Sequence, residues 1–537
     1  MPTQFLISVN TGWSQRPHGK AEVAVGEKFG PRALPRGRIK RFVLLQVPAV
    51  GVRALVFAAL LAMTVPLRSD VILDWTTLMV DAIRADNTAP NVATRNFAIL
   101  HVAVWDAVNS VSNTHQPYAF LLETPPDTSP EAAAVAAAYH VFVALYPSFV
   151  AWADDLYDAW LASAPGGPAQ GNGLSLGAHM AVLILELRGN DGSAIDVPYI
   201  PSSSPGEWQR TPPFFRPPLA PQWGYVDLFC LPALDPFLPV SPPALDSPAY
   251  AAALNEVKAL GARLSTVRTP EQSQIAQFWS DFSYTATPPG HWQQIAASIA
   301  RARNNSLLEN ARSFTLLSLA QADAAIVCWE AKYRHNLWRP VTAVQRAGED
   351  GNDATEPDPG WTSFLAAPPF PSYTSGHSTF SKASAEVLAR FYNTDQITFS
   401  ATSDSLPGIV RTFNSLSACV DEIGRSRIYA GIHFEFDNRE GKRTGQAVAQ
   451  YITANYLLPN QRLPEVRLQR IVDGIPQLLV HGRVGISCLV QTSSDLVNWQ
   501  TLSTNMATSG GVLVIDPAAT SVRARFYRVL ELGGAAK

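Results

Sequence analysis

Three short segments in the second half of the chain carry side chains suited to holding a small anion. They are residues 332–340 (KYRHNLWRP), 371–377 (PSYTSGH) and 426–437 (SRIYAGIHFEFD). Lysine supplies a point charge, and arginine supplies a planar fork of N–H donors that matches the oxygens of a phosphate-like ion. The three segments therefore predict a cage for a tetrahedral oxyanion.

The elements that carry this cage can be inferred from spacing. Lys332 and Arg339 are seven residues apart, which is two helical turns, so we expect both on one face of one helix. Ser375 and Gly376 precede an apolar helical run at 378–391, which predicts backbone N–H groups and a hydroxyl at a helix N-terminus. Such a terminus attracts anions.

Two histidines are placed to act on whatever the cage holds. His377 follows Gly376 in the first helical turn, where it could act as an acid/base, and His433 could serve as a ligand or a nucleophile. Asp437, four residues after His433, could hold the other ring nitrogen and set its tautomer. Each feature alone has an ordinary explanation: the Lys/Arg pair as solvated surface charges, the Ser-Gly-His sequence as a helix cap, and a single histidine as a core residue. Their joint occurrence in this order indicates a site.

Together these residues resemble the vanadium-dependent haloperoxidase and type 2 phosphatidic acid phosphatase superfamily. The stretches 369–380 (PFPSYTSGHSTF) and 426–437 look like the haloperoxidase version, and 103–109 (AVWDAVN) looks like a landmark of its secreted bacterial branch. The resemblance covers about residues 70–457 and implies a mainly helical bundle. Thr374 stands where the superfamily usually has proline, so we expect a change in loop rigidity rather than lost anion binding.

The resemblance also implies a role for each residue. The groups that would hold the oxyanion are Lys332, Arg339, Ser375, Gly376 and Arg427. His433 would coordinate vanadium with Asp437 behind it, His377 would be the acid/base, and Lys332 would also polarise a bound oxygen. Trp329 and Phe370 resemble a halide pocket, although ordinary core aromatics have the same sequence signature.

The function implied is oxidation of halide by hydrogen peroxide, with vanadate as cofactor. The alternative is an acid phosphatase that cleaves phosphate esters through a phosphohistidine at His433, because phosphate and vanadate share charge and shape. A third alternative is a secreted anion-binding or adhesion protein that keeps the cage for structure. A net charge of −3 and 16% charged residues give no reason to expect a nucleic-acid partner.

Helical periodicity dominates the chain before residue 457. We expect helices at 91–112, 131–145, 148–163 and 178–188, and again from 250 to about 456, with no region that alternates like a sheet. Residues 198–248 hold 14 prolines and are expected to form an ordered belt packed down by its aromatic side chains. The G-x-S-x-G sequence at 173–177 has no strand before it, so we do not interpret it as a nucleophile.

The two ends of the chain differ from the middle. Residues 465–533 are rich in Val, Leu and Thr runs and predict a separate small β-sandwich, which could contact carbohydrate or a surface. Residues 1–69 carry ten Lys/Arg against two Glu around a short apolar run, typical of a signal peptide or leader. We therefore expect a secreted or periplasmic protein, with an uncleaved membrane anchor as the alternative.

Overall fold

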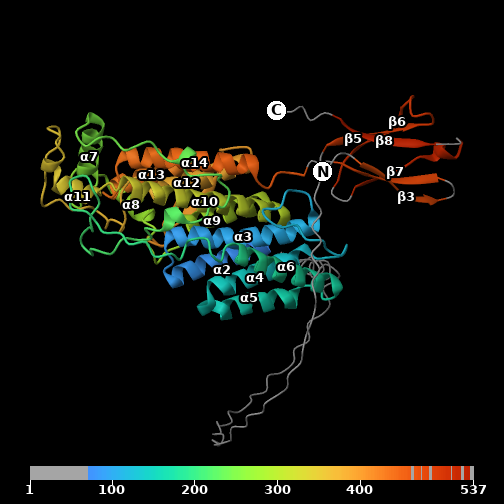
Figure 1. The fold of residues 1–537 in the computed structure, drawn as a ribbon, viewed down its shortest axis with the longest axis horizontal. Coiled ribbons are helices and arrows are strands. Elements are labelled where there is room, and N and C mark those ends of the chain that lie inside the picture. Colours follow the sequence, from blue (N-terminus) through green and yellow to red (C-terminus); the bar gives the residue numbers. More distant parts are fainter. Residues whose placement is uncertain are drawn as a thin grey trace, which may run out of the picture. The chain divides into compact units, whose positions relative to one another are not determined.

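The computed structural model describes residues 70–460, 465–472, 475–482, 486–508, 511–521 and 525–532. The leader expected at residues 1–69 lies outside the described residues. The chain is mainly α-helical, with small sheets near its C-terminal end, which confirms the fold class expected from the sequence (Figure 1). None of the four cysteines forms a disulfide, and all four are buried.

The first group of helices lies side by side around a shared core. Its members are α2 (Val71–Asp86), α3 (Pro90–Ser112), α4 (Pro130–Leu145), α5 (Val150–Ser163) and α6 (Pro168–Leu187). The helix expected at 178–188 begins earlier, at Pro168, so the G-x-S-x-G sequence lies inside α6. A Cβ at Gly177 would stand 2.2 Å from the carbonyl oxygen of Ala133, and glycine therefore permits the close contact between α6 and α4.

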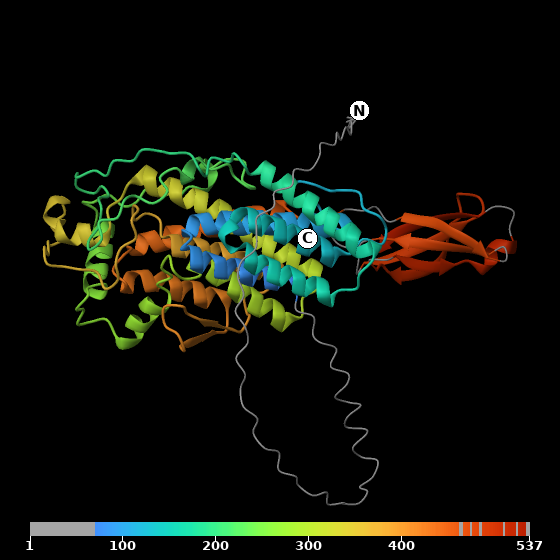
Figure 2. The same cartoon turned by 90° about the horizontal axis from the view of Figure 1, so that it is seen from below.

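The second group of helices carries the three predicted site segments. Its members are α7 (Pro248–Leu260), α8 (Pro270–Phe278), α9 (Thr287–Arg303), α10 (Leu307–His335), α11 (Pro340–Gln345), α12 (Gly376–Phe391), α13 (Leu416–Tyr429) and α14 (Glu435–Asn455). Figures 1 and 2 show α10, α12 and α14 with nearly parallel axes, and α3 lies beside α10 where the two groups meet. One hydrophobic core runs through both groups.

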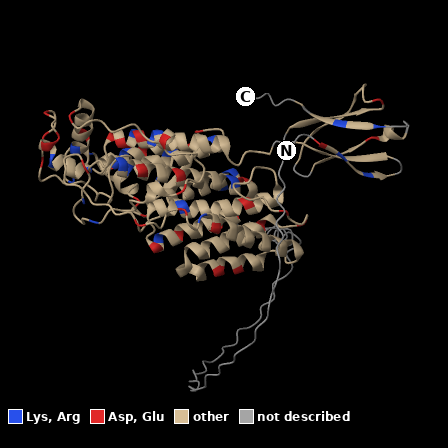
Figure 3. Ribbon diagram, in the orientation of Figure 1, with Lys and Arg blue, Asp and Glu red and all other residues tan. Residues whose placement is uncertain are grey.

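Charge is distributed unevenly between the two groups. Residues 96–187 contain no lysine or arginine, and Figure 3 accordingly shows acidic but no basic residues on α4, α5 and α6. The three cations of the predicted cage, Lys332, Arg339 and Arg427, all lie in α10 or later. Among the described residues, no single helix is long and apolar enough to cross a membrane, although the bent pair Pro130–Leu145 and Pro147–Ser163 meets that test in combined length and composition.

The proline-rich belt at 198–248 contains two short 3₁₀ turns, Trp223–Tyr225 and Asp235–Phe237. Asp323 on α10 fastens it, because its carboxylate accepts hydrogen bonds from the N–H groups of residues 229, 230 and 231 at 2.7–2.9 Å. The expectation that its aromatic side chains all pack down is wrong for half of them. Three are buried (Trp208, Trp223 and Phe229), while three are exposed (Phe214, Phe215 and Tyr225).

The expectation that no part of the helical region forms a sheet is also wrong. Strands β1 (Phe399–Thr402) and β2 (Val410–Phe413) pair in an antiparallel hairpin between α12 and α13. Four-residue strands are too short to give a clear alternating pattern in the sequence. Phe399 and Phe413 face each other across the hairpin and pack into the helical core.

The C-terminal strands form two three-stranded antiparallel sheets. One has the order β3 (Glu465–Val472), β4 (Ile475–His481), β7 (Val512–Ile515), and the other β6 (Gln500–Met506), β5 (Ser487–Ser493), β8 (Phe526–Leu532). Side chains from both sheets build one small core that includes Leu478, Val490 and Val529. This is the arrangement of a small β-sandwich. That residues 465–533 are an independent domain stays a prediction.

Candidate active site

Lys332 and Arg339 flank a break between two helices. Lys332 lies in the last turn of α10, which ends at Asn336 in the left-handed conformation, and Arg339 is the N-cap of α11. The prediction that both residues share one helix face is therefore wrong. Pro340 disfavours helical geometry at Arg339 and favours a new helix start instead. Both side chains are nevertheless fully buried on the same side of the bundle, against the ring of Phe370.

The ammonium group of Lys332 is held by the backbone of the second segment. Its Nζ donates to the carbonyl oxygens of Pro371 at 3.2 Å and Ser372 at 3.1 Å, and also to that of Thr374. Burial lowers the pKa of Lys332 to about 7, and the positive charge of Arg339 adds to the lowering. Lys332 thus fixes the loop that leads to Ser375, using one donor on each carbonyl.

The guanidinium of Arg339 joins the second and third segments. Its Nε donates to the carbonyl of Phe370 at 2.8 Å, and its Nη1 donates to the carbonyl of Ile432 at 2.8 Å and to Nε2 of His433 at 3.1 Å. Its Nη2 is buried without a hydrogen-bond partner among the described residues. Burial lowers the pKa of this arginine to about 9, so the group is desolvated but still a cation at neutral pH.

Ser375 and Gly376 stand at the start of α12, as the sequence predicts. Ser375 is the N-cap, and its Oγ accepts from the N–H of Ser378 at 3.3 Å. Its own N–H donates to the carbonyl of Asp437 at 3.1 Å, which ties α12 to α14. The two helices approach closely because α14 presents glycine there: a Cβ at Gly445 would lie 2.2 Å from the carbonyl oxygen of Thr379.

His433 lies just before α14, with each ring nitrogen in a defined environment. Its Nδ1 is 2.7 Å from Oδ2 of Asp437, an oxygen that also accepts from the hydroxyl of Ser372 at 2.5 Å. Since a carboxylate only accepts, Nδ1 carries the proton and Nε2 keeps its lone pair. Burial, followed by the charge of Arg339, holds the pKa of His433 well below its usual value, so the ring is neutral.

Arg427 and His377 complete the buried polar set. Arg427, in the last turn of α13, donates from Nη1 to the carbonyl of Trp279 at 2.7 Å, and its Nε has no partner among the described residues. Nε2 of His377 is likewise buried and unpartnered within the described part of the chain. Burial, and then the charge of Arg427, lowers the pKa of His377 well below its usual value.

These groups meet at a cavity of about 80 Å³, enough room for a small anion and a few water molecules. Six predicted residues line it: Trp329, Phe370, Gly376, His377, Arg427 and His433. Four others lie one contact behind this lining: Lys332, Arg339, Ser375 and Asp437. The rings of Trp329 and Phe370 stand 5.1 Å apart and form an apolar wall. The structure thus brings all ten residues together, and their roles stay predictions.

Several polar residues near the cavity were missed, including the four described next. Asp281 and Arg216 line it, Ser372 bonds to Asp437, and His291 lies behind Asp281. Ser372 belongs to the PSYTSGH segment, so it could have been proposed as a partner of the histidine or its carboxylate. Asp281 lies in a loop with no periodic pattern, and His291 follows that loop in the sequence. Arg216 lies in the proline belt. No local sequence signal marks those three.

Buried polar atoms without partners test whether the site suits an oxyanion. Nη2 of Arg339, Nε of Arg427 and Nε2 of His377 are buried without hydrogen-bond partners in the described residues, and a buried polar atom normally has one. Two of the three belong to cations, which favours a negatively charged ligand over water. The residues present therefore fit a tetrahedral oxyanion such as vanadate, with His433 as the neutral ligand.

The helical bundle and this cavity define the class: a mainly helical protein with a buried cationic pocket. A family model described as the VCPO second helical-bundle domain matches residues 312–458. A vanadium chloroperoxidase from Curvularia inaequalis is 30% identical over 230 residues, which is 32% of this chain and 37% of that relative. The match thus spans just over a third of that relative's length.

Solved structures extend the likeness over a larger share of the chain. A structure described as the first bacterial vanadium-dependent iodoperoxidase aligns with a TM-score of 0.65 and 29% identity, over 73% of this chain and 98% of that one. The holo form of a bacterial vanadium-dependent chloroperoxidase aligns with a TM-score of 0.56 and 16% identity, over 68% and 92% of the two chains, and shows the same fold. The chain is thus similar to vanadium chloroperoxidase in the sequence of residues 312–458, and to a bacterial vanadium-dependent iodoperoxidase in fold over 73% of its length.

Proposed function

We propose that the protein is a vanadium-dependent haloperoxidase, which oxidises a halide with hydrogen peroxide at a vanadate bound through His433. The relatives described above are named as chloroperoxidases and an iodoperoxidase. The observation that carries the proposal is the pair of buried, unpartnered N–H donors on Arg339 and Arg427, together with the unpartnered Nε2 of His377, beside a neutral His433 whose Nε2 keeps its lone pair.

The residues divide the work between binding and proton transfer. Asp437 and Ser372 fix the Nδ1–H tautomer of His433, which leaves Nε2 as the ligand atom. Arg339 and Arg427 neutralise the anion's oxygens. His377, neutral before binding, can take up a proton at Nε2 once a negative charge is close and give it back later. Vanadate, when bound, supplies the Lewis acidity that activates peroxide.

Trp329 and Phe370 form the apolar wall on which a weakly hydrated halide would lie. Phe370 also contacts both buried cations, with the Nζ of Lys332 at 4.8 Å and the Cζ of Arg339 at 4.9 Å from its ring centre. These contacts hold the ring in place. The same wall and the small cavity disfavour a bulky phosphate ester, which is why the phosphatase alternative ranks second.

The decisive experiment supplies purified protein with orthovanadate and hydrogen peroxide, measures oxidation of chloride, bromide and iodide, and runs a phosphate-ester assay beside it. We expect vanadate-dependent halide oxidation. Ester cleavage without halide oxidation would transfer the function to the phosphatase alternative.

Three variants separate the proposed roles. His433→Ala should abolish vanadate-dependent activity, and His377→Ala should bind vanadate but turn over about 10²–10⁴-fold more slowly. Asp437→Ala should fall between them, with a loss of about 10–100-fold, because it acts through His433. Wild-type vanadate binding and turnover in His433→Ala would refute the assignment.

Two further parts of the proposal concern the ends of the chain. We propose export across a membrane, directed by residues 1–69, and the test is the N-terminal sequence of protein recovered outside the cytosol. For the C-terminal strands, contact with carbohydrate or a surface stays a prediction, which binding of residues 465–533 to polysaccharides would test.

A further inference from the structure

Asp281 lies between the imidazoles of His291, which is buried, and His377, which is half-buried, at the edge of the cavity. Its Oδ1 is 3.2 Å from Nδ1 of His291, and its Oδ2 is 3.9 Å from Nε2 of His377. The carboxylate is 5% exposed, and its backbone has a φ of 43°, a left-handed conformation that is uncommon for a residue other than glycine. Such a conformation persists where surrounding contacts fix it, and it often marks functional sites.

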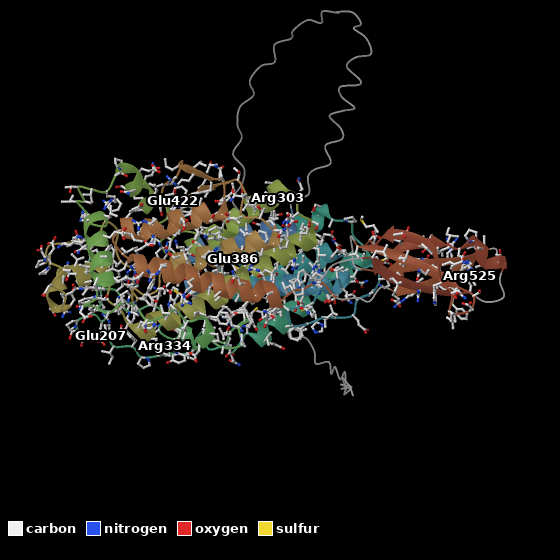
Figure 4. All side chains as sticks on the ribbon, turned by 90° about the horizontal axis from the view of Figure 1, so that it is seen from above. Glu207, Arg303, Arg334, Glu386, Glu422 and Arg525 are labelled. Atoms are coloured by element: carbon white, nitrogen blue, oxygen red, sulfur yellow. The ribbon has the colours of Figure 1, made fainter. Side chains whose placement is uncertain are left out.

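His291 is itself held on several sides. It lies near the start of α9, and its ring packs on Trp279 at 4.7 Å with an interplanar angle of 32°. The indole Nε1 of Trp279 donates to Glu422 at 2.8 Å, and the labels in Figure 4 locate that glutamate. The carbonyl of Trp279 in turn accepts from Arg427. The imidazole of His291 therefore belongs to the same packed unit as the cage.

The direction of the hydrogen bond follows from its partners. An ionised carboxylate only accepts, so Nδ1 of His291 carries the hydrogen and donates it to Oδ1 of Asp281. This bond uses one carboxylate oxygen and leaves the other turned toward His377. The distance of 3.9 Å exceeds a direct hydrogen bond but is within the range of a strong charge interaction in a buried site.

We propose that His291 is a positioning residue, which holds Asp281 so that its second oxygen stabilises the imidazolium form of His377. The inference depends on the proposed function in one respect, because it assumes that His377 transfers protons in that reaction. No bond to substrate is involved, because His291 acts through Asp281.

The surroundings of His377 explain why such a carboxylate matters. Arg427 from α13, His291 from α9 and Lys332 from α10 all face His377 and disfavour its protonated form, while a backbone contact to Trp279 favours it. Asp281 is the carboxylate within ion-pair distance of His377 in the described residues. A second carboxylate, Asp404, faces His291 from the hairpin side, where it is paired with Arg84.

The test compares two substitutions that both remove the imidazole ring. His291→Asn keeps an N–H donor close to the position of Nδ1, whereas His291→Leu keeps the volume and loses the donor. NMR of the full chain saturated with inorganic phosphate would give the pKa of His377, because phosphate probes the cage without redox chemistry. The kcat of the vanadate-loaded enzyme against pH is the second measurement.

We expect Asp281→Asn to lower the pKa of His377 by about one unit, since a nearby negative charge is lost. Both His291 variants lose the ring that itself disfavours protonated His377, so they are compared with each other: the pKa of His377 should be about one unit lower in His291→Leu than in His291→Asn, and kcat should follow the same order. Equal shifts in His291→Asn and His291→Leu would overturn the inference, as would no shift in Asp281→Asn. If His291→Leu does not fold, His291→Gln replaces it, because its amide reaches the Nε2 position instead.

The two hypotheses can fail separately. Absence of halide oxidation in the wild type would refute the haloperoxidase function, and the NMR comparison would still decide the role of His291.

Discussion

The pKa of Lys332 leads to a quantitative prediction about anion binding. Burial places this pKa at about 7 in the ligand-free protein, whereas a bound oxyanion would return it toward the ordinary value of about 10.4. Between these two pKa values, binding must then be accompanied by proton uptake. The favourable charge of Lys332 contributes fully to binding below pH 7, and the contribution falls progressively as the pH rises from 7 through the bound-state pKa.

The size of the effect follows from the protonated fraction. With a pKa of about 7, half of the molecules carry the ammonium at pH 7 and about one in a hundred at pH 9. Vanadate affinity should therefore fall about 50-fold between these two pH values. The fall comes on top of any change in the protonation of vanadate itself, which must be cancelled by a control.

Lys332→Met and Lys332→Arg provide that control, because neither side chain titrates in this range. Equilibrium dialysis with orthovanadate would measure affinity for all three proteins at pH 7 and pH 9. The ratio of wild-type to Lys332→Met affinity should drop about 50-fold, and Lys332→Arg should show the same pH slope as Lys332→Met. Calorimetry in two buffers should show more proton uptake on binding in the wild type than in either variant. Identical slopes in all three proteins would refute the reasoning.

Two further predictions concern access to the site and its helical frame. Arg216 lines the cavity, whereas Arg210, an exposed arginine of the same belt, does not. Arg216→Ala should therefore slow vanadate association several-fold, and Arg210→Ala should leave the rate unchanged. Equal association rates for the two variants in stopped-flow measurements at low salt would refute this. Gly445→Ala forces a Cβ to within 2.2 Å of a carbonyl oxygen of α12 and should lower the free energy of unfolding by about 1–3 kcal/mol. Gly171→Ala, which has open space around it, should be neutral or stabilising. Denaturant unfolding in which Gly171→Ala is the less stable variant would contradict the packing argument.

Local sequence rules were sufficient for the helices and for much of the site. Ser375 was identified as the residue before a helix because serine followed by an apolar periodic run is a strong start signal, and α12 begins there. Helix α3 was predicted to within one residue for the same kind of reason. The spacing of His433 and Asp437 anticipated a contact that the structure places at 2.7 Å.

Contacts that depend on tertiary packing could not be predicted from the sequence. The helical repeat suggested that Lys332 and Arg339 share one face, but Asn336 ends α10 between them, and the two cations meet through the loop at 370–374 instead. Asp281 reaches the cavity from a loop that is held through Trp279 by Arg427 of α13, an element far away in the sequence. The exposed aromatics of the belt were misjudged because composition does not say which side of a loop faces solvent.

The position of the ten cage residues along the chain has a consequence for how such proteins diverge. All of them lie between Trp329 and Asp437, inside the stretch 312–458 that the family model matches. The groups that border the cage from outside that stretch, Arg216, Asp281 and His291, belong to connecting loops or the start of α9. The segment that carries the predicted cage can therefore be conserved as one unit during evolution. The flanking regions can change independently and alter how protons and anions reach the cage. Two enzymes with identical cages can in this way differ in pH optimum and preferred halide.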